Sequence, residues 1–488
     1  MKLHIALFLL GILIHTNGIS LDTPLPRIAI VGGGNGGASA SHFLTELLNG
    51  NLEIDLYEVK TIGGRLATIK IGDDEFEAGG AIIHPKNMYM QKFVKLLGLE
   101  HNSPDGLKMG IWNGDEFVFK ESDWSIVTIA QLLYRYGFQL FKLNRYVNDI
   151  LDDFLKIYDL QDAGMSFANV TALLSALNKD FPKLLQTPIK DHLLHMGFTN
   201  QLIDELVQAV NVVNYGQEIN IQSFVSLVSL AGASGELWSV KNGNKEVPQH
   251  LIYRNKNVNV VPSRVTKIRY VADNDKNQYE VTYINKDSTD PMTSNYDIVI
   301  IATPLTHDQA FPIEFVGFPD DFIFQGNYQT TYATFVKGNL NPKYFGLKET
   351  IDAIFSCNPN KTIISSIGQQ GLVNGLVKKN SPVWKIFSRK SIDTNLIDKM
   401  FSKVTEKKEI LWKAYPQYST NLQLNKFKLH DALYHVNAIE WAASAMEMSA
   451  IAGRNVAILA SDDFLQKYKP ISTKAYKDST KKLRTNEL

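Results

Sequence analysis

A glycine-rich turn near the start of the chain constrains the fold more than any other feature. Arg27–Val31 is a short apolar run, typical of a buried parallel strand. Gly32, Gly34 and Gly37 follow at once in the order G-x-G-x-x-G, and residues 38–48 then carry apolar side chains at helical spacing. The first glycine permits a tight turn, the second lets the backbone approach a pyrophosphate, and the third lets the helix pack on the strand. The order of these segments predicts a dinucleotide-binding α/β fold.

An acidic residue follows where such a fold uses one. The predicted strand 52–58 ends in Glu58, about 20 residues after Gly37, where a carboxylate can bind the ribose hydroxyls of an adenosine. A solvated carboxylate at a strand end is the alternative. With the strand, turn, helix, second strand and acid all in order, we expect nucleotide binding.

Two further glycine pairs indicate which dinucleotide is bound. Gly63-Gly64-Arg65 and Glu77-Ala78-Gly79-Gly80 resemble the flavin-side segments of the FAD-dependent amine-oxidase and protoporphyrinogen-oxidase superfamily. That resemblance implies FAD rather than NAD. We expect Arg65 to neutralise the pyrophosphate, unless it is a plain surface cation, and the glycines to bring backbone N–H groups close to the flavin ring, where a Cβ would intrude.

Later segments complete the predicted cofactor domain. Strands are predicted within 255–271, at 278–284 and within 296–304, the last ending at Thr303 beside the cofactor sheet. The segment 435–460 joins Glu440 to a helix of small residues that we expect near the flavin, although an ordinary packing helix has the same composition. The predicted cofactor-binding residues are Gly32, Gly34, Gly36, Gly37, Glu58, Gly63, Gly64, Arg65, Gly79, Gly80, Thr303, Glu440 and Ala445.

The first twenty residues predict a secretory signal peptide, with Lys2 before an apolar run at 5–14 and small residues near position 20. An uncleaved anchor is the alternative, but the run is shorter than the ~20 residues that span a bilayer. Cys357 is the sole cysteine, so no intrachain disulfide can form, and we assign it no chemistry. Asn169 and Asn360 lie in glycosylation sequons.

The charge balance, with 50 basic and 50 acidic residues, gives no electrostatic reason to expect a nucleic-acid partner. We predict no metal site.

The chain resembles the prenylcysteine oxidase family, also called prenylcysteine lyase, from about Arg27 to Leu459. The segments that carry the resemblance are GGRLAT, EAGGAIIHP, GIWNGDEFVF, YRYGFQ, VNYGQ, IVIIATPL, VWKIFS and AASAMEMSAIA. The resemblance implies a flavoenzyme of the secretory pathway, destined for the lysosome or for secretion, with tightly but noncovalently bound FAD. It implies cleavage of farnesylcysteine or geranylgeranylcysteine, with O2 and water, to cysteine, a prenyl aldehyde and hydrogen peroxide.

That chemistry requires no protein nucleophile. The carbon between sulfur and the prenyl chain is allylic, so loss of hydride to FAD leaves a cation spread over sulfur and the alkene. Water then adds, and the hemithioacetal collapses. The protein orients the carbon against the flavin, in a long apolar pocket.

Apolar lining is expected from 123–141 and 210–230. Tyr134, Phe138 and Phe141 are more typical of ordinary core than of a substrate wall, and exposed apolar faces of these helices could contact lipid or lipoprotein.

Three polar residues are candidates for catalysis. His84 follows the flavin-side glycines and could orient water or assist proton transfer. Tyr215 and Gln217 could hold the amino-acid head of the substrate by hydrogen bonds. Structural roles are the alternative for all three.

The fold class is α/β, with a Rossmann-like FAD-binding domain assembled from 27–108, 235–310 and 428–462. A mixed α+β substrate domain, 109–234 and 311–427, is inserted, and 463–488 form a tail. A flavin amine oxidase and a non-catalytic flavin- or prenyl-binding scaffold are the rival functions.

Overall fold

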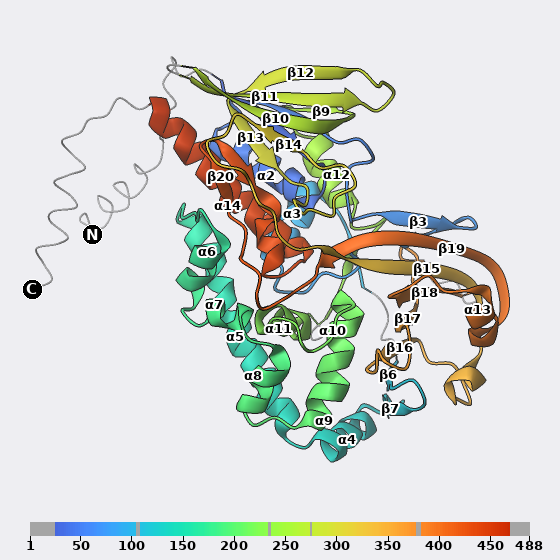
Figure 1. Cartoon of the computed structure of the whole chain (residues 1–488). Helices are drawn as coiled ribbons and strands as arrows, with labels where there is room; N and C mark the ends of the chain where they lie inside the picture. The colour runs from blue at the N-terminus through green and yellow to red at the C-terminus, as the bar shows by residue number, and fades with distance from the viewer. Residues whose placement is uncertain (1–24, 104–107, 233–235, 274–275, 377–381, 469–488) are drawn as a thin grey trace, which may run out of the picture.

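The computed structural model describes residues 25–103, 108–232, 236–273, 276–376 and 382–468 (Figure 1). The predicted signal peptide and residues 469–488 of the predicted tail lie outside these ranges. Within them, every helix is too short or too polar to span a membrane.

A six-stranded sheet carries the predicted cofactor fold, with strand order β20-β21-β13-β1-β2-β9. Its neighbours pair in parallel, apart from the antiparallel β20 at one edge. The strands are β1 (Arg27–Val31), β2 (Glu53–Tyr57), β9 (Val258–Val261), β13 (Ile298–Ile301), β20 (Lys428–His430) and β21 (Leu433–His435). Ile28 and Ile30 of β1 are fully buried. The predicted buried strand and the Rossmann-like fold are confirmed.

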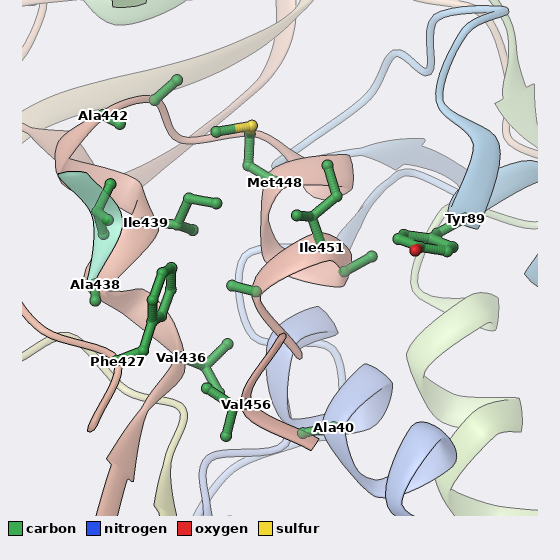
Figure 2. Packing of buried hydrophobic residues seen from close by; sticks show 14 of the residues in the cluster. Ala40, Tyr89, Phe427, Val436, Ala438, Ile439, Ala442, Met448, Ile451 and Val456 are labelled. Carbon is green, nitrogen blue, oxygen red and sulfur yellow. The ribbon is translucent and has the colours of Figure 1, made fainter. Parts of the chain in front are cut away.

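Helices cover this sheet and pack on one another through small residues. They are α2 (Asn35–Leu47), α3 (Met88–Leu97), α12 (Glu246–Tyr253) and α14 (Met446–Tyr468). A Cβ on Gly453 of α14 would lie 2.8 Å from the Ser39 Cβ of α2, so the absence of a side chain lets the two helices approach closely. Figure 2 shows Ala40 of α2 in the same buried cluster as Val436 and Val456.

A second sheet, β12-β11-β10-β14, lies beside the first (Figure 1). Its strands are β10 (Ser263–Asp273), β11 (Lys276–Asn285), β12 (Pro291–Tyr296) and β14 (Glu314–Val316). The strands predicted within 255–271, at 278–284 and within 296–304 are therefore confirmed as β9 and β10, β11, and β13.

A seven-stranded sheet, β19-β15-β18-β17-β16-β6-β7, extends away from the cofactor fold (Figure 1). All its neighbours are antiparallel except β16 and β6. Its strands are β6 (Met109–Trp112), β7 (Phe117–Lys120), β15 (Tyr328–Leu340), β16 (Ala353–Ser356), β17 (Ile364–Gln369), β18 (Val383–Ser388) and β19 (Phe401–Pro416). The hairpin of β3 (Thr68–Ile71) and β4 (Asp74–Glu77) packs on it through Ile71 and Phe76.

A helical region forms the lower part of the molecule in Figure 1. It comprises α4 (Ser125–Tyr136), α5 (Gln139–Asp162), α6 (Val170–Leu177), α7 (Phe181–Leu185), α8 (Ile189–His195), α9 (Asn200–Leu202), the π-helical turn η1 (Ile203–Val207), α10 (Gln208–Tyr215) and α11 (Ser223–Ala231). The remaining elements are β5 (His101–Asn102), β8 (Ser239–Val240), η2 (Pro342–Phe345), α13 (Thr394–Met400) and η3 (Val436–Trp441).

The helical region and all the strands of the seven-stranded sheet come from 109–234 and 311–427, the segments expected to form a substrate domain. The strands of the six-stranded sheet come from the three segments expected to form the FAD domain. The domain boundaries stay a prediction.

Candidate cofactor and substrate site

A cavity of about 320 Å³ lies where β1 and β13 end, within the range of about 300–1,000 Å³ typical of ligand sites. We divide its wall into two halves. The cofactor half is built from the turn after β1, the segments 63–65 and 78–80, Thr303 and the residues before α14. The predicted cofactor residues that line the cavity are Gly32, Gly34, Gly36, Glu58, Gly63, Gly64, Arg65, Gly79, Gly80, Thr303, Glu440 and Ala445.

The glycines of the first turn serve different purposes. Gly32 has φ +110°, and a Cβ there would lie 2.7 Å from the Ala302 carbonyl oxygen. Gly37 lies behind the wall, and its Cβ would overlap the Gly32 carbonyl oxygen. A Cβ on Gly34 would instead enter open space, 3.9 Å from the nearest protein atom, the Gly64 Cα. The turn therefore fits a ligand that approaches the backbone at Gly34.

The start of α2 suits an anion. The helix begins at Asn35, directly after Gly34, and it has no acidic residue in its first turn and no side-chain cap. The first N–H groups of a helix have no partner within the helix, and they carry a partial positive charge. Because Gly34 and Asn35 line the cavity, these groups fit the pyrophosphate of a dinucleotide.

Glu58 stands between this cavity and a second one of about 200 Å³. Its two carboxylate oxygens accept hydrogen bonds from the backbone N–H groups of Gly33, at 3.0 Å, and Lys60, at 2.8 Å. Each carboxylate oxygen can accept a further hydrogen bond, so Glu58 could also bind ribose hydroxyls at the junction of the two cavities. The second cavity is lined in part by Arg264, Val265 and Phe324. Because it adjoins Glu58, it lies where the adenine base would follow a ribose bound to that residue. The wall therefore fits an extended dinucleotide.

Arg65 is paired inside the protein. Its guanidinium forms an ion pair with Glu440 and donates a 2.7 Å hydrogen bond to the Ala414 carbonyl. Burial lowers the pKa of Arg65, but the Glu440 carboxylate outweighs burial, so the net pKa is raised. Glu440 is almost completely buried and also accepts hydrogen bonds from Tyr328 and Asn437. This neutral pair supplies no net positive charge for a pyrophosphate. The glycine turn and the start of α2 offer the cavity N–H groups that suit an anion, and a role of Arg65 at a pyrophosphate stays a prediction.

The segment 78–80 is held by hydrogen bonds to its own carbonyl groups. The Trp412 indole donates to the Ala78 carbonyl at 3.1 Å, and the Asn244 amide donates to the Gly80 carbonyl at 2.9 Å. A Cβ on Gly79 would overlap the Arg65 carbonyl oxygen. Glycine is thus required at 79 by the neighbouring backbone, and this packing requirement exists without any contribution from a flavin.

A buried acid and a buried base support the same segment. Lys385 of β18 donates to the Glu77 carbonyl at 3.1 Å, and the Glu77 carboxylate accepts from the Asn244 N–H at 2.6 Å. Burial lowers the pKa of Lys385 to about 8 and raises that of Glu77 to about 7. Lys385 and Asn244 were not predicted as site residues, because neither lies in a cofactor motif.

The three candidate catalysts do not line the cavity. The His84 Nδ1 accepts the Lys86 N–H at 3.1 Å, and the His84 N–H donates to the Asn87 side chain at 2.8 Å. Both contacts shape the loop before α3. A structural role explains His84 as the structure places it.

Tyr215 and Gln217 support the wall from behind. The buried Tyr215 hydroxyl donates to the Ser444 carbonyl at 3.3 Å. The Gln217 amide donates to the Pro416 carbonyl at 2.9 Å, and its oxygen accepts the Tyr418 N–H at 2.8 Å. Catalytic roles for His84, Tyr215 and Gln217 stay predictions that this geometry does not favour.

The substrate half of the cavity wall is mainly apolar. Its residues come from α10 and from the seven-stranded sheet: Val212, Val213, Gly216, Thr331, Ser365, Phe387, Trp412 and Tyr415. Thr331 is buried, and its hydroxyl has no hydrogen-bond partner within the described part of the chain. The predicted segment 210–230 thus contributes to the wall.

The segment 123–141 does not line the cavity. Tyr134, Phe138 and Phe141 are neither substrate wall nor core, because their side chains are exposed. Helical spacing predicts which residues share a face, but it does not predict whether another element covers that face.

Comparison with known proteins identifies the family. A model described as prenylcysteine lyase matches residues 119–473, and a model of an NAD(P)-binding Rossmann-like domain matches 30–97. The chain is 38% identical to prenylcysteine oxidase 1 of Homo sapiens over 463 residues, which cover 91% of this chain and 90% of the relative. The chain belongs to the prenylcysteine lyase family. Prenylcysteine oxidase 1-like of Bos taurus is 35% identical, with 93% and 94% covered.

Membership of the prenylcysteine lyase family, together with the Rossmann-like fold, makes this chain an FAD-dependent oxidoreductase. Solved structures with the same fold include a putative protoporphyrinogen oxidase from Exiguobacterium sp. 255-15, with a TM-score of 0.59, 11% identity, and 91% of this chain and all of that chain covered. Cyclohexylamine oxidase from Brevibacterium oxydans IH-35A has a TM-score of 0.58, 13% identity, and coverage of 90% and 99%.

The other residues singled out in the sequence are also placed. Cys357 is buried, and burial raises its pKa to about 11, which disfavours the nucleophilic thiolate at neutral pH. The Asn169 side chain accepts from the Ala172 N–H at 2.8 Å and caps α6, whereas Asn360 is exposed in a turn. Among the described residues, no cluster of three or more His, Cys, Asp or Glu could hold a metal ion.

Proposed function

We propose that this chain oxidatively cleaves the thioether of S-prenylcysteine, with a farnesyl or geranylgeranyl chain, to cysteine, a prenyl aldehyde and hydrogen peroxide. One observation carries the proposal: a single cavity joins a dinucleotide cradle to an apolar half in a member of the prenylcysteine lyase family. The related human protein is named prenylcysteine oxidase 1, which supports the substrate class.

The substrate has one carbon that is both allylic and bonded to sulfur. Loss of hydride from this carbon leaves a cation that sulfur and the alkene share. When bound, FAD supplies the acceptor for the hydride and the route by which its two electrons reach O2. Water adds to the cation, and the resulting hemithioacetal collapses to the thiol and the aldehyde. One O2 and one water are consumed for each hydrogen peroxide formed.

The residues of the substrate half bind and orient the prenyl chain. Phe387, Trp412 and Val213 present apolar surface to the cavity, and burial of a prenyl chain against them removes water from the reacting carbon. The Trp412 indole N–H is already bonded to Ala78, so its ring has no unsatisfied donor toward the chain.

The polar side chains of the cavity wall contribute less to this reaction than the apolar residues that bind the prenyl chain. The described lining residues include no cysteine and no histidine, in keeping with a reaction that needs no protein nucleophile. The unpartnered Thr331 hydroxyl fits the cysteine head of the substrate or the attacking water. Proper placement of the reacting carbon is the main contribution of the protein.

Product analysis tests this proposal. The purified holoenzyme is incubated in air with S-farnesylcysteine and, separately, with a panel that includes putrescine and cyclohexylamine. We expect equal amounts of cysteine, farnesal and hydrogen peroxide, with aldehyde oxygen derived from isotopically labelled water. Peroxide formation from amines alone would support a flavin amine oxidase. Absence of turnover with either class would support a binding scaffold.

We further propose that the chain enters the secretory pathway and reaches the lysosome or is secreted, with glycans on Asn169 and Asn360. The N-terminal sequence and the exposure of Asn360 support this. Expression in secretory cells should give a protein whose apparent mass on a gel falls when N-glycans are removed. The fall in apparent mass should be smaller for Asn360→Gln. A protein retained in the cytosol with no glycan would contradict it.

Contact with a lipid or lipoprotein surface is the last part of the proposal. A prenyl chain partitions into lipid, so an enzyme for such substrates gains from access to that phase.

A further inference from the structure

Two asparagines on the cofactor half of the cavity wall have a side-chain oxygen with no hydrogen-bond partner among the described residues. They are Asn35 and Asn437. Asn35 is 7% exposed and Asn437 is 8% exposed, so both side chains are almost entirely buried. A buried polar atom without a partner costs free energy, and native proteins pair nearly all such atoms. The two oxygens therefore indicate a ligand group that donates hydrogen bonds.

The amide nitrogens fix the orientation of both side chains. The Asn35 Nδ2 donates to the Met446 carbonyl at 2.7 Å, and the Asn437 Nδ2 donates to the Glu440 carboxylate at 2.7 Å. A carbonyl and a carboxylate only accept hydrogen bonds, so a flipped amide would place two acceptors against each other at either position. Each nitrogen is thus bound to the protein, and each oxygen is left for another partner.

Both asparagines belong to one junction of three elements on the cavity wall. Gly36 follows Asn35 in α2, and Val436 precedes Asn437 in η3. A Cβ on Gly36 would lie 2.9 Å from the Val436 Cγ1, so the starts of α2 and η3 pack directly against each other. Met446, whose carbonyl Asn35 binds, is the first residue of α14. The two free oxygens therefore come from neighbouring segments of the wall.

This junction lies between the two parts of the cofactor that the cavity is expected to hold. The pyrophosphate fits the N–H groups at Gly34 and the start of α2, beside Asn35. On the other side, the flavin ring is expected at Gly79 and Gly80, and a Cβ on Gly80 would lie 3.8 Å from the Met446 Cγ. In FAD, the ribityl chain joins the pyrophosphate to the flavin ring.

The ribityl chain also has the chemistry that the two oxygens require. Each of its hydroxyl groups can donate a hydrogen bond, whereas a pyrophosphate offers only acceptors. We propose that Asn35 and Asn437 accept hydrogen bonds from hydroxyl groups of the FAD ribityl chain. This role depends on the cofactor and is independent of the substrate proposed above.

Glu440 holds Asn437 in place for this role. The Glu440 Oε1 accepts hydrogen bonds from Arg65 and from the Asn437 amide, and its Oε2 accepts one from Tyr328. A carboxylate held by several donors keeps a fixed position, so the amide that it binds is fixed as well. The buried ion pair of Arg65 and Glu440 thus positions a side chain of the cofactor half.

Exchange of the bound cofactor tests the proposal. The full-length holoenzyme is incubated with mixtures of FAD and an FAD analogue that lacks one ribityl hydroxyl, until the ratio of bound flavins no longer changes. Mass spectrometry of the released flavins gives that ratio. We expect the unchanged protein to favour FAD over at least one analogue by about fivefold to tenfold, because one hydrogen bond is lost. In Asn35→Leu or Asn437→Leu, the preference against the affected analogue should fall close to one.

The control is a third asparagine with an unpartnered oxygen. Within the described ranges the Asn327 Oδ1 also lacks a partner, but Asn327 lines neither cavity. Asn327→Leu should therefore favour FAD over each analogue as the unchanged protein does. Equal loss of preference in Asn327→Leu and Asn437→Leu would show that any buried asparagine has this effect, and it would contradict the proposal.

Two further results would overturn the proposal. One is an unchanged protein that binds every analogue as well as FAD, because no ribityl hydroxyl would then be bound. That measurement needs no variant, so it decides the question even if a leucine variant does not fold. The other is preferences in both leucine variants as strong as those of the unchanged protein, which would leave the amides a structural role only. Cleavage of S-prenylcysteine is measured by its products, so its failure is distinguishable from either result.

Discussion

The two halves of the cavity are built by different means. In the cofactor half, glycines and backbone hydrogen bonds set the shape, and a Cβ at Gly37 or Gly79 would overlap a carbonyl oxygen. In the substrate half, side chains such as Phe387 and Trp412 form the surface, and the Thr331 hydroxyl has no partner among the described residues. Where the backbone forms the wall, adding a side chain at a glycine displaces the neighbouring backbone. Where side chains form the wall, a substitution changes the shape or polarity of the cavity at one position only. Four substitutions test that difference, in order of expected effect.

Gly79→Ala should have the largest effect. The added Cβ overlaps the Arg65 carbonyl oxygen, so both backbone segments must shift. We expect loss of bound FAD and a fall of about 3 kcal/mol in the free energy of unfolding. The ratio of flavin to protein absorbance and chemical denaturation measure these effects. Gly371→Ala is the control, because a Cβ there meets no atom within 4 Å. A Gly79→Ala protein that retains FAD normally would refute the backbone-built cofactor half.

Glu440→Gln should destabilise the protein by about 3 kcal/mol, because it leaves the Arg65 charge without its partner. Glu440 has 1% of its side-chain surface exposed and Arg65 has 32%, so water can replace only part of the lost partner. We expect weaker FAD binding, measured by flavin release on dilution. The control is Glu53→Gln, which removes an exposed partner of Arg27 and should change stability by less than about 1 kcal/mol. Tighter FAD binding in Glu440→Gln would show that Arg65 neutralises the pyrophosphate after all.

Glu77→Gln should change how stability depends on pH. Burial raises the pKa of Glu77 from its ordinary value of 4.5 to about 7, so the folded state binds this proton more tightly than the unfolded chain. That contribution is complete below pH 4.5 and is lost as pH rises to about 7. Between these values the unchanged protein should lose about 3 kcal/mol relative to Glu77→Gln.

Denaturation at several pH values measures this effect. Lys385 titrates in a separate window, between about 8 and 10.5, where stability rises with pH. Parallel pH profiles for the Glu77→Gln variant and the unchanged protein would contradict the interpretation of Glu77.

Thr331→Val should have the smallest effect and should act on substrate alone. Loss of one hydrogen bond to the substrate head raises KM for S-farnesylcysteine by about fivefold to tenfold, with FAD binding unchanged. Thr330→Val is the matched control, because successive side chains of β15 face opposite sides of the sheet. Equal KM values for the two variants would remove Thr331 from substrate binding.

The contrast between the halves also explains what the sequence could predict. The turn at Gly32, Gly34 and Gly37, the acid at Glu58 and the strands of the cofactor sheet are local patterns, and the structure places them as expected. The pairing of Arg65 with Glu440 joins residues far apart in the chain, so spacing cannot reveal it. Lys385 lies among the apolar residues Val383, Trp384, Ile386 and Phe387 of β18, where no motif marks a buried cation.

The exposed apolar residues of α4 and of the start of α5 show a second limit of sequence-based prediction. Periodicity correctly predicts that Tyr134 and Phe141 lie in helices, whereas Phe138 lies in the turn between α4 and α5. The expected burial of these side chains was wrong, because no element of the described chain covers that face. Burial is a property of the tertiary arrangement, and it depends on elements that the local sequence does not contain.

An anaerobic titration of the holoenzyme with S-farnesylcysteine tests the central claim most directly, because it needs both halves of the cavity at once. We predict that the yellow flavin absorbance bleaches in proportion to added substrate, that farnesal appears in equal amount, and that admission of O2 restores the colour. A flavin that stays oxidised with excess S-farnesylcysteine would contradict the account.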